Sequence, residues 1–533
     1  MAGPGAGKTH WLISHVKNVL AHSDRLGKCG KIACITYTNT GVETIVRRIG
    51  ASTKAVEVCT IHSFFYNHIV KPYLHFIAEE EGFNMDLLKG ADDRFDLSYP
   101  TLETIKKQTR QNYVDDKCLT DAIRSAKWRF DEHGDIVCKP EYPKIAKFGK
   151  RTFLSSKTYP AYKRLAWARG LMQYDDVIYF AYRIFEKIPF AQEVIARKFP
   201  YLFVDEFQDS HPIQVKIIKK IAGHGSIIGV IGDPAQSIYQ FLGADVAQFD
   251  AFTLSGMKEY VIDGNRRSTT KIIDFLNGIR KDLQQVSHRT KEGDAPLLLI
   301  GSHIDNYNKL LEMVGKNVYA LAYDNLSANS LKKMMNVNVV DKHLIDKIPD
   351  SNEKRKSIVS TFIKALEHAK AGNFKKAFEL FGRIDIEIKN AVVFIQKLLS
   401  DYDNFKDKPL YEFYEYLNNT FGLGMTAMKG GKGKNFYDGH SYMELAMSVN
   451  HEDDTSLQRT IHRAKGDEFD NVMVCLGEED ALEFFLDPDL QKKEAHRVYY
   501  VAASRAKEKL FFSIPTLSDE NRKELEKIGL EIK

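Results

Sequence analysis

The chain has 533 residues, too many for a single hydrophobic core and enough for three or four domains. Hydrophobic residues make up 44% and charged residues 28% of the sequence, as in an ordinary soluble globular protein. The net charge of +5 permits nucleic-acid binding without establishing it, so local charge patterns have to decide.

Cysteine spacing and hydropathy exclude several classes of protein. The six cysteines show no paired metal-ligand spacing, so we expect neither a zinc site nor a disulfide framework, and the reducing cytoplasm fits best. No stretch approaches about 18 consecutive apolar residues, and residues 1–30 lack a basic-then-apolar signal pattern. We therefore expect neither membrane insertion nor secretion.

A glycine-rich turn opens the chain, where residues 2–9 read AGPGAGKT. Glycines let the backbone bend so that successive N–H groups point at phosphate oxygens; Lys8 would then reach the β- and γ-phosphates, and Thr9 would hold Mg²⁺. Ala2 stands where the usual pattern has its first glycine. Apolar residues at helical spacing predict a helix from about residue 9 to residue 22. The residues expected to hold the nucleotide here are Gly3, Gly5, Ala6, Gly7, Lys8, Thr9 and His10.

Two apolar strands further along the chain end in polar residues that suit phosphate chemistry. Residues 201–210 read YLFVDEFQDS, a strand that delivers Asp205 to hold Mg²⁺ through water and Glu206 to polarise the attacking water. A second strand within residues 227–241 ends in Gly-Asp-Pro and is followed by Gln236. With both strands present, the first turn is interpreted as a phosphate-binding loop.

Eight short motifs follow one another along the chain. They read AGPGAGKT (2–9), ITYTNTG (35–41), TIHSFF (60–65), VDEFQD (204–209), GDPAQSIYQF (232–241), GNRRS (264–268), TIHRAKGDEFD (460–470) and VAASRAK (501–507). In this order they resemble the motifs of the UvrD/Rep/PcrA group of superfamily 1 DNA helicases, and the resemblance spans nearly all of the chain. It implies an α/β fold with two RecA-like parallel-sheet motor domains, each carrying a mostly helical insertion, and an ATP- and Mg²⁺-dependent DNA helicase.

The resemblance also implies roles for single residues of the nucleotide site. Gln236 matches a glutamine that senses the γ-phosphate. Arg267 and Arg505 match arginine fingers, planar cations that reach the γ-phosphate from the second motor domain. Glu468 matches a carboxylate that contacts the ribose. Arg266 stands where the family has an adenine-stacking tyrosine, and a guanidinium plane can also stack on an aromatic face.

The same resemblance implies a DNA track. Single strands are gripped by aromatic rings that stack on bases and by hydroxyl or basic groups that contact phosphates. The implied contacts are Tyr37, Thr38, Asn39, His62, Ser63, Phe64, Tyr239, Phe241, Thr460 and His462. The family usually has tryptophan where this chain has Phe241.

The motifs divide the chain into four parts. Residues 1–72 with 165–262 are expected to form the first motor domain, and residues 263–335 with 445–533 the second. Residues 73–164 and 336–444 are expected to be their helical insertions, the second one shorter than in full-length members of the family.

Each insertion contains one stretch of further interest. Residues 139–169 hold nine Lys or Arg against one Glu. They are interleaved with aromatic residues, which suits strand binding unless the aromatic rings pack inward. These aromatic residues are Tyr142, Phe148, Phe153, Tyr159, Tyr162 and Trp167. In the second insertion, apolar spacing over residues 353–381 predicts a helical hairpin that breaks at Gly372, and residues 428–436, MKGGKGKNF, suggest a mobile basic loop.

One part of the family pattern is missing from this sequence. Family members have, before the glycine turn, an adenine-reading glutamine element and the first strand of the sheet. Three explanations stay open: a start codon assigned too late, a partner or rearranged segment that supplies the strand, or an impaired ATP site.

The sequence thus predicts an ATP-dependent translocase or helicase that moves from 3′ toward 5′ on single-stranded DNA or at junctions of single- and double-stranded DNA. Its expected setting is DNA repair, recombination or anti-phage defence. The alternative is a DNA-binding or regulatory subunit of a larger, nuclease-containing complex, with weak or no ATPase activity of its own. A nuclease is the expected class of protein partner.

Overall fold

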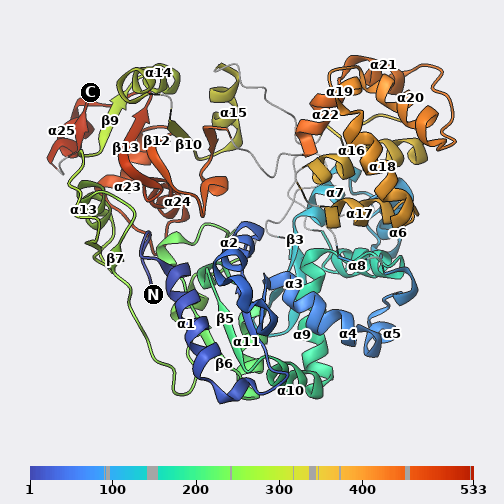
Figure 1. Cartoon of the computed structure of the whole chain (residues 1–533), viewed down its shortest axis with the longest axis horizontal. Coiled ribbons are helices and arrows are strands. Elements are labelled where there is room, and N and C mark those ends of the chain that lie inside the picture. The colour runs from blue at the N-terminus through green and yellow to red at the C-terminus, as the bar shows by residue number, and fades with distance from the viewer. Residues whose placement is uncertain are drawn as a thin grey trace. The chain divides into compact units, whose positions relative to one another are not determined.

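A computed structural model gives the arrangement of the chain (Figure 1). It describes residues 1–88, 90–91, 97–140, 154–240, 243–315, 317–334, 344–345, 347–370, 372, 374–449, 456–527 and 530–533. Two compact units are present: Met1–Tyr323 together with Thr460–Lys533, and Asp324–Arg459.

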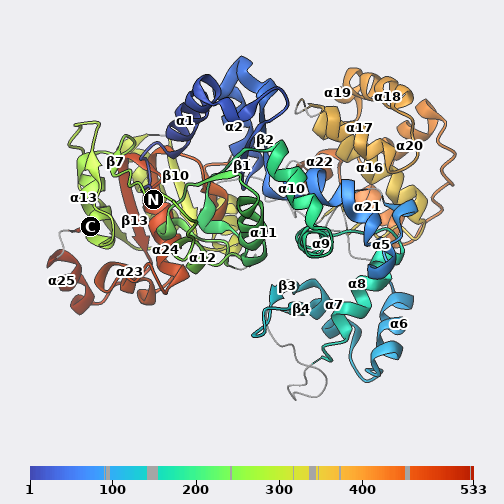
Figure 2. The ribbon, with the colours of Figure 1, turned by 90° about the horizontal axis from the view of Figure 1, so that it is seen from below.

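The first unit contains a four-stranded parallel sheet in the order β2-β1-β5-β6. Its strands are β1 (Ile32–Thr36), β2 (Val56–Thr60), β5 (Tyr201–Val204) and β6 (Ile227–Val230). Helices flank it (Figures 1 and 2), namely α1 (Lys8–His22), α2 (Asn39–Ile49), α3 (Ile61–Phe65), α9 (Tyr174–Lys187), α10 (Pro189–Lys198) and α11 (Pro212–Gly223). The side chains of β1 alternate between two cores: Ile32 and Cys34 pack with α1 and α2, whereas Ala33 and Ile35 pack with α9, α10 and α11. The strand is apolar throughout because both faces are buried.

The start of the chain lies beside the carboxyl end of β6. The backbone N–H of Ala2 donates to the carbonyl of Gly232 at 3.0 Å. Gly3 donates to the carbonyl of Ile262 at 3.2 Å, and Ile262 donates back to Met1 at 3.0 Å. Ala2 and Ile262 form a parallel bridge, so the backbone that leads into the glycine turn is held by β-type hydrogen bonds.

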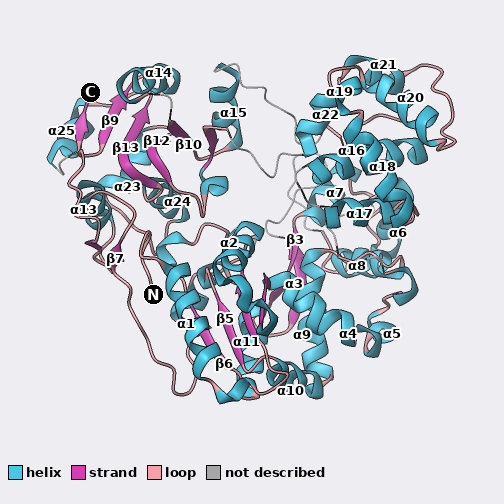
Figure 3. Ribbon diagram, in the orientation of Figure 1, coloured by secondary structure: helices cyan, strands magenta, loops and turns pink. Residues whose placement is uncertain are grey.

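A six-stranded sheet in the order β11-β10-β12-β13-β9-β14 lies in the second half of the chain. Its strands are β9 (Leu297–Ile300), β10 (Val318–Ala322), β11 (Gln458–Thr460), β12 (Phe469–Cys475), β13 (Ala506–Ile514) and β14 (Glu531–Ile532). The pairs from β10 through to β14 are parallel. The helices of this part are α13 (Thr270–Ile279), α14 (His303–Val314), α23 (Glu483–Leu486), α24 (Glu494–Ala503) and α25 (Asp519–Lys527). Figure 3 shows the strands in magenta between cyan helices. The predicted α/β fold with two parallel sheets is confirmed, whereas the bounds of the four parts stay predictions.

The segment between residues 73 and 164 is mixed rather than only helical. It contains α5 (Ala78–Glu81), α6 (Tyr99–Thr109), α7 (Asp116–Arg124) and α8 (Thr158–Ala168), and also an antiparallel hairpin of β3 (Ala126–Phe130) and β4 (Ile136–Pro140). The hairpin forms because Trp128 on β3 faces a core, where its ring stacks on Tyr179 of α9 at 3.9 Å between centroids.

The predicted strand-binding role of the basic aromatic stretch is wrong for the three aromatic residues that the structure describes. Tyr159, Tyr162 and Trp167 are only 4%, 2% and 3% exposed. Trp167 and Trp128 both donate their indole N–H to Asp176, at 3.1 and 2.9 Å. These rings therefore pack inward, which was the alternative interpretation. Tyr142, Phe148 and Phe153 lie outside the described residues.

The second unit is helical in its described residues. Its helices are α15 (Asn325–Met334), α16 (Glu353–Lys370), α17 (Phe374–Gly382), α18 (Ile388–Ser400), α19 (Tyr402–Phe405), α20 (Leu410–Phe421), α21 (Lys432–Gly439) and α22 (Tyr442–Val449). The predicted hairpin over residues 353–381 is confirmed by α16 and α17. The predicted mobile loop over residues 428–436 is wrong in its second half, since α21 begins at Lys432 and Lys434 lies over the ring of Tyr411.

Within the described part of the chain, no helix has the length and apolar character needed to cross a membrane. All six cysteines lie in that part and carry free thiols.

Candidate active site

The glycine turn ends at the N-terminus of α1. Gly5 and Gly7 have φ angles of 67° and 82°, in the left-handed region that glycine adopts without strain. Gly7 is the N-cap of α1, and no side chain caps the helix. The backbone N–H groups of the first turn, including those of Lys8 and Thr9, therefore have no capping side chain. A helix N-terminus of this kind is the usual geometry of a phosphate site. His10 in the same turn is exposed.

The segment around Asn265–Arg267 packs closely on this turn. A Cβ atom at Gly5 would lie 2.7 Å from both the Cβ of Arg267 and the Oδ1 of Asn265, so no larger residue fits there. The exposed side chain of Arg266 donates to the carbonyl of Ala6 at 3.3 Å, and its N–H donates to the carbonyl of Gly5 at 2.9 Å. A Cβ atom at Gly3 would likewise overlap the side chain of Gln285.

The two predicted carboxylates follow directly after β5. Asp205 is 5% exposed, and its N–H donates to the carbonyl of Ile35 on the neighbouring strand at 2.8 Å. Glu206 has a φ angle of 54°, which is strained for a residue with a side chain. Its carboxylate accepts a hydrogen bond from Gln208 Nε2 at 2.6 Å. Strain of this kind clusters at functional sites because the surrounding structure has to impose it.

The two carboxylates differ in their pKa values. Burial and the adjacent Glu206 raise the pKa of Asp205, against the opposing effect of Lys8. Burial also acts to raise the pKa of Glu206, but the cations of Lys8 and Lys465 lower it overall. Glu206 is thus held as an anion that can accept a proton. The ionised form of Asp205 would be stabilised by an additional cation.

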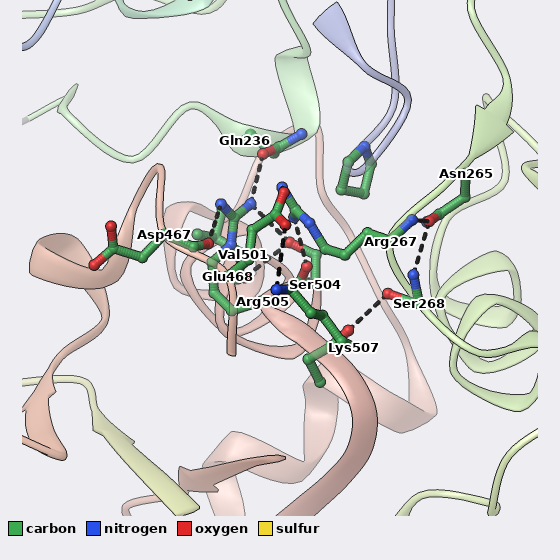
Figure 4. A network of polar contacts seen from close by, with 12 residues as sticks. Gln236, Asn265, Arg267, Ser268, Asp467, Glu468, Val501, Ser504, Arg505 and Lys507 are labelled. Carbon is green, nitrogen blue, oxygen red and sulfur yellow. Dashed lines mark hydrogen bonds and ion pairs between the residues drawn. The ribbon is translucent and has the colours of Figure 1, made fainter. Parts of the chain in front are cut away.

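Four predicted residues of the nucleotide site meet in one polar network (Figure 4). Arg505 Nη2 donates to Gln236 Oε1 at 2.9 Å. Arg267 Nη2 lies 2.7 Å from a carboxylate oxygen of Glu468. Arg267 Nη1 donates to the carbonyl of Ser504 at 2.8 Å, which ties the two arginines to the same turn. Burial and the neighbouring Arg267 lower the pKa of Arg505 to about 9.

The predicted DNA-track residues are only partly brought together. The rings of Tyr37 and Tyr239 are stacked with centroids 6.2 Å apart, and His462 lies 6.3 Å beyond Tyr239. All three side chains are partly exposed. Lys465 Nζ lies 4.5 Å from the centre of the Tyr239 ring. Tyr37, Tyr239 and His462 thus form a cluster of partly exposed rings, and the mostly buried ammonium of Lys465 lies against the ring of Tyr239.

Several other predicted contacts have local structural roles. Thr38 caps α2 by accepting from Gly41 N at 3.1 Å, next to the exposed Asn39. The hydroxyl of Ser63 accepts from Thr60 at 2.9 Å. Burial lowers the pKa of His62 to about 4.

For Phe64 the prediction of DNA stacking is wrong in this structure. Its ring is fully buried and packs 5.1 Å from that of Phe199, in the core beneath β1. Thr460 is also buried, and its contact with DNA stays a prediction. Phe241 lies outside the described residues.

Sequence reasoning missed two groups of residues that the structure places at the site. Lys465 forms a buried ion pair with Asp209 and donates to the backbone carbonyl of Gln236 at 2.9 Å. Both residues lie in motifs quoted above, so their opposite charges could have indicated this ion pair. A second ion pair joins Arg280 to Asp233. Nothing in the sequence marks Arg280, which follows an ordinary apolar helix.

Comparison with known proteins gives the family. Residues 1–255 match the UvrD/REP helicase N-terminal domain, and residues 445–516 match the UvrD-like helicase C-terminal domain. The chain belongs to the UvrD-like helicase family.

Three relatives illustrate how far this UvrD-like chain resembles characterised proteins. It is 27% identical to the ATP-dependent DNA helicase PcrA of Bacillus subtilis (strain 168) over 297 residues, 53% of this chain and 37% of PcrA. It is 28% identical to DNA helicase II of Haemophilus influenzae over 281 residues, 52% of this chain and 37% of that protein. Against the Gabija protein GajB of Bacillus cereus (strain HuB5-5), identity is 24% over 330 residues, 54% of this chain and 47% of GajB. The chain thus covers less than half the length of each of these relatives.

Proposed function

We propose that this UvrD-like protein is an ATP-dependent motor that translocates along single-stranded DNA from 3′ toward 5′ and unwinds duplex at junctions. One observation carries the proposal: Gln236, Arg267, Glu468 and Arg505 meet in a single network (Figure 4). Phosphoryl transfer needs cations where charge develops and a carboxylate that accepts a proton from water. The same compact unit contains both, together with the glycine turn.

The nucleotide is proposed to bind on the glycine turn. Backbone N–H groups of the turn and the ammonium of Lys8 would hold the phosphates. His10, Arg266 and Glu468 are the residues proposed to contact the base and the ribose. The buried Nε of Arg267 has no hydrogen-bond partner within the described part of the chain. This donor supports the proposed position of the nucleotide beside Arg267, because a phosphate oxygen would accept from it.

Thr9 and Asp205 fit a Mg²⁺ ion. They supply a hydroxyl and a carboxylate, the hard oxygen ligands that Mg²⁺ prefers beside substrate phosphates. The raised pKa of Asp205 agrees with a carboxylate arranged to face a cation. When bound there, Mg²⁺ supplies positive charge that offsets the negative charge of the phosphates. The described residues contain no cluster of three or more His, Cys, Asp or Glu side chains that could hold a metal ion, so the proposed site depends on these two residues and the nucleotide.

The hydrolytic step is assigned to residues of this chain. Glu206 accepts a proton from the attacking water, and its lowered pKa keeps it ready to do so. Arg267 exchanges its contact with Glu468 for a phosphate oxygen, and Arg505 turns to the phosphate while Gln236 still accepts from it. Both cations then stabilise the developing charge. Nucleotide binding is thereby coupled to movement of the segments that carry these arginines.

The DNA strand is proposed to run over the partly exposed rings of Tyr37, Tyr239 and His462. Stacking of bases on aromatic rings tolerates any sequence, as a translocase requires. Tyr239 follows Gln236 closely in the chain, so a change at the phosphate sensor is transmitted to a DNA-contacting ring.

We place this activity in the cytoplasm, in DNA repair, recombination or anti-phage defence, with a nuclease as the proposed class of partner. The six free thiols agree with a reducing compartment. Among the relatives, two are named as DNA helicases and one as a Gabija protein, which keeps these settings open for this chain.

Steady-state ATP hydrolysis with and without single-stranded DNA tests the proposal. We expect DNA to stimulate turnover, and Lys8→Ala and Arg505→Ala each to abolish the stimulated rate. Lys17→Ala is the matched control, because Lys17 is an exposed lysine on the same helix as Lys8. Background turnover of the wild-type chain with DNA bound would reject the motor and favour a DNA-binding or regulatory subunit.

A further inference from the structure

A buried ion pair lies behind the proposed phosphate sensor. Arg280 directly follows α13, and Asp233 is the N-cap of the short 3-10 turn Pro234–Gln236. The guanidinium Nη1 of Arg280 lies 2.7 Å from Oδ1 of Asp233, and both side chains are fully buried. The contact is an ion pair without an aligned hydrogen bond, because Arg280 directs Nε and Nη2 at the carboxylate of Asp282, 2.9 and 3.0 Å away.

Asp233 in turn fixes the orientation of the Gln236 amide. Gln236 Nε2 donates to Oδ2 of Asp233 at 2.5 Å, while Oε1 of the same amide accepts from Arg505 at 2.9 Å. A carboxylate can only accept and a guanidinium can only donate, so the two neighbours leave the amide one orientation. Asp233 also accepts from Ala235 N at 3.2 Å, which holds the carboxylate in place.

The positive charge of Arg280 maintains this arrangement. Burial lowers the pKa of a guanidinium, but the carboxylates of Asp233 and Asp282 raise that of Arg280 overall, so it stays charged. Without Arg280, the buried Asp233 carboxylate would lose the cation that contacts it and holds it beside the Gln236 amide. A displaced carboxylate would no longer accept from Gln236 Nε2, so the amide would lose the partner that fixes its orientation toward Arg505.

We propose that Arg280 is a positioning residue for ATP hydrolysis, which acts through Asp233 to hold the Gln236 amide oxygen toward Arg505. Arg280 reaches Arg505 only through Asp233 and Gln236, which contact each other and the two arginines in turn. This inference rests on the proposed function. It adds a residue outside the motifs quoted above to the nucleotide site.

A double-mutant cycle between Arg280 and Gln236 tests the relay. We expect Arg280→Met to lower the DNA-stimulated kcat about tenfold or more while the KM for ATP changes less than about threefold, because an orientation is lost rather than a binding contact. Arg280→Lys should recover part of the rate, since it restores the charge. In a Gln236→Ala background, Arg280→Met should change kcat by less than about twofold, because residues that act in series are not additive.

Arg355→Met is the matched control. Arg355 and Asp350 form another buried Arg–Asp pair, 2.6 Å apart at Nε and Oδ2, in the unit Asp324–Arg459. Arg355→Met should lower the thermal midpoint as Arg280→Met does and leave kcat within about twofold of wild type. Equal losses of kcat in Arg280→Met and Arg355→Met would show that Arg280 has only a structural role. The same conclusion would follow if Arg280→Met lowered kcat as much in the Gln236→Ala background as in the wild type.

A second readout needs neither ATP nor turnover. In the full chain labelled with ¹⁵N-glutamine, the Gln236 side-chain amide is identified by the signal that Gln236→Ala removes. We expect slow exchange of this amide with water in the wild type, and a shifted, faster-exchanging signal in Arg280→Met and Asp233→Asn. An unchanged Gln236 signal in either folded variant overturns the relay. If Arg280→Met does not fold, Asp233→Asn and Arg280→Lys decide the question with the same two measurements.

The two readouts separate this inference from the proposed function. A wild-type chain without ATPase activity would reject the proposed function, yet the Gln236 signal would still show whether Arg280 orients the amide. An active wild type with an unchanged Gln236 signal in the variants would reject the relay alone.

Discussion

Glu206 combines backbone strain with a stabilised negative charge. Its φ of 54° aims the side chain away from the direction that a strand end would give it, and the cations of Lys8 and Lys465 lower its pKa. A strained residue is retained only where the surrounding structure imposes the geometry. We interpret both features as preparation of a general base.

Glu206→Gln should therefore block chemistry and leave binding intact. Glutamine keeps the size of the side chain but cannot accept the proton, so we expect turnover to fall by about 10²–10⁴-fold. Equilibrium binding of ATP should stay within about threefold of wild type. Glu193→Gln is the control, because Glu193 is an exposed carboxylate in an ion pair with Arg197. Unchanged turnover in Glu206→Gln would show that Glu206 is not the general base.

His211 gives the stability of the chain a pH dependence. Its Nδ1 accepts from Ile213 N at 3.2 Å at the start of α11, and burial, followed by the nearby Arg129, lowers its pKa to about 4. The unfolded chain binds the proton near pH 6.5, so stability is complete above that pH and is lost as the pH falls from about 6.5 to about 4.

The loss assigned to His211 is on the order of 1–3 kcal/mol. His211→Asn keeps an N-cap acceptor without a titrating group. We expect the variant to lose less stability than wild type between pH 7 and pH 5 in urea denaturation. Identical pH profiles would assign the acid sensitivity to other groups, such as His62.

At the scale of elements, the glycine turn is specified by what packs against it. Gly5 needs both a left-handed φ and the absence of a side chain, since a Cβ would lie 2.7 Å from Arg267 and Asn265. Gly27 has a similar φ of 51°, but nothing lies within 4 Å of its Cβ position. Substitutions at these two glycines therefore distinguish the cost of backbone strain from the cost of steric overlap.

Gly5→Ala should abolish nucleotide binding, whereas Gly27→Ala should cost only the strain of the left-handed region, about 1 kcal/mol. The expected reason is displacement of the Asn265–Arg267 segment from the turn. Isothermal titration with ATP and Mg²⁺, together with the thermal midpoint of each variant, measures the two effects. Normal ATP affinity in Gly5→Ala would mean that this packing is not required for binding.

The aromatic residues of the DNA track fall into two classes. Phe64 belongs to the core, so Phe64→Ala should cost about 3–5 kcal/mol of unfolding free energy. Tyr239 is partly exposed, so Tyr239→Ala should mainly weaken DNA binding, by about 1–3 kcal/mol for a lost base stack. Fluorescence anisotropy with a labelled oligothymidine and urea denaturation distinguish the two. Tyr113→Ala, half exposed and outside the track, is the control. Equal DNA affinity in Tyr239→Ala and Tyr113→Ala would contradict the proposed track.

Sequence patterns predicted the elements whose chemistry is local. The glycine turn, the strand before Asp205 and the hairpin of α16 and α17 were recognisable because each depends on residues close together in the chain. The pair of Arg280 and Asp233 was not, because it joins residues far apart in sequence and carries no periodicity. The burial of Phe64 was missed for a similar reason, since a motif gives a residue type without its orientation.

At the scale of the whole molecule, the described residues form two units with separate cores. The residues of the proposed nucleotide site lie within Met1–Tyr323 and Thr460–Lys533, and the unit Asp324–Arg459 has its own core around α16. A ligand that binds only the folded state stabilises the unit that contains its site. Calorimetry should therefore resolve two transitions with different responses to nucleotide.

We expect a non-hydrolysable ATP analogue with Mg²⁺ to raise the midpoint of one transition by a few degrees, since binding at about 100 times Kd adds about 2.7 kcal/mol. Lys8→Ala should remove that shift. Arg355→Met should lower the other transition, because breaking a buried ion pair costs about 3–5 kcal/mol. A single transition that moves with both changes would show that the two units unfold together. In that case nucleotide binding would stabilise the whole chain, and signals from the ATP site could reach the helical unit through shared stability.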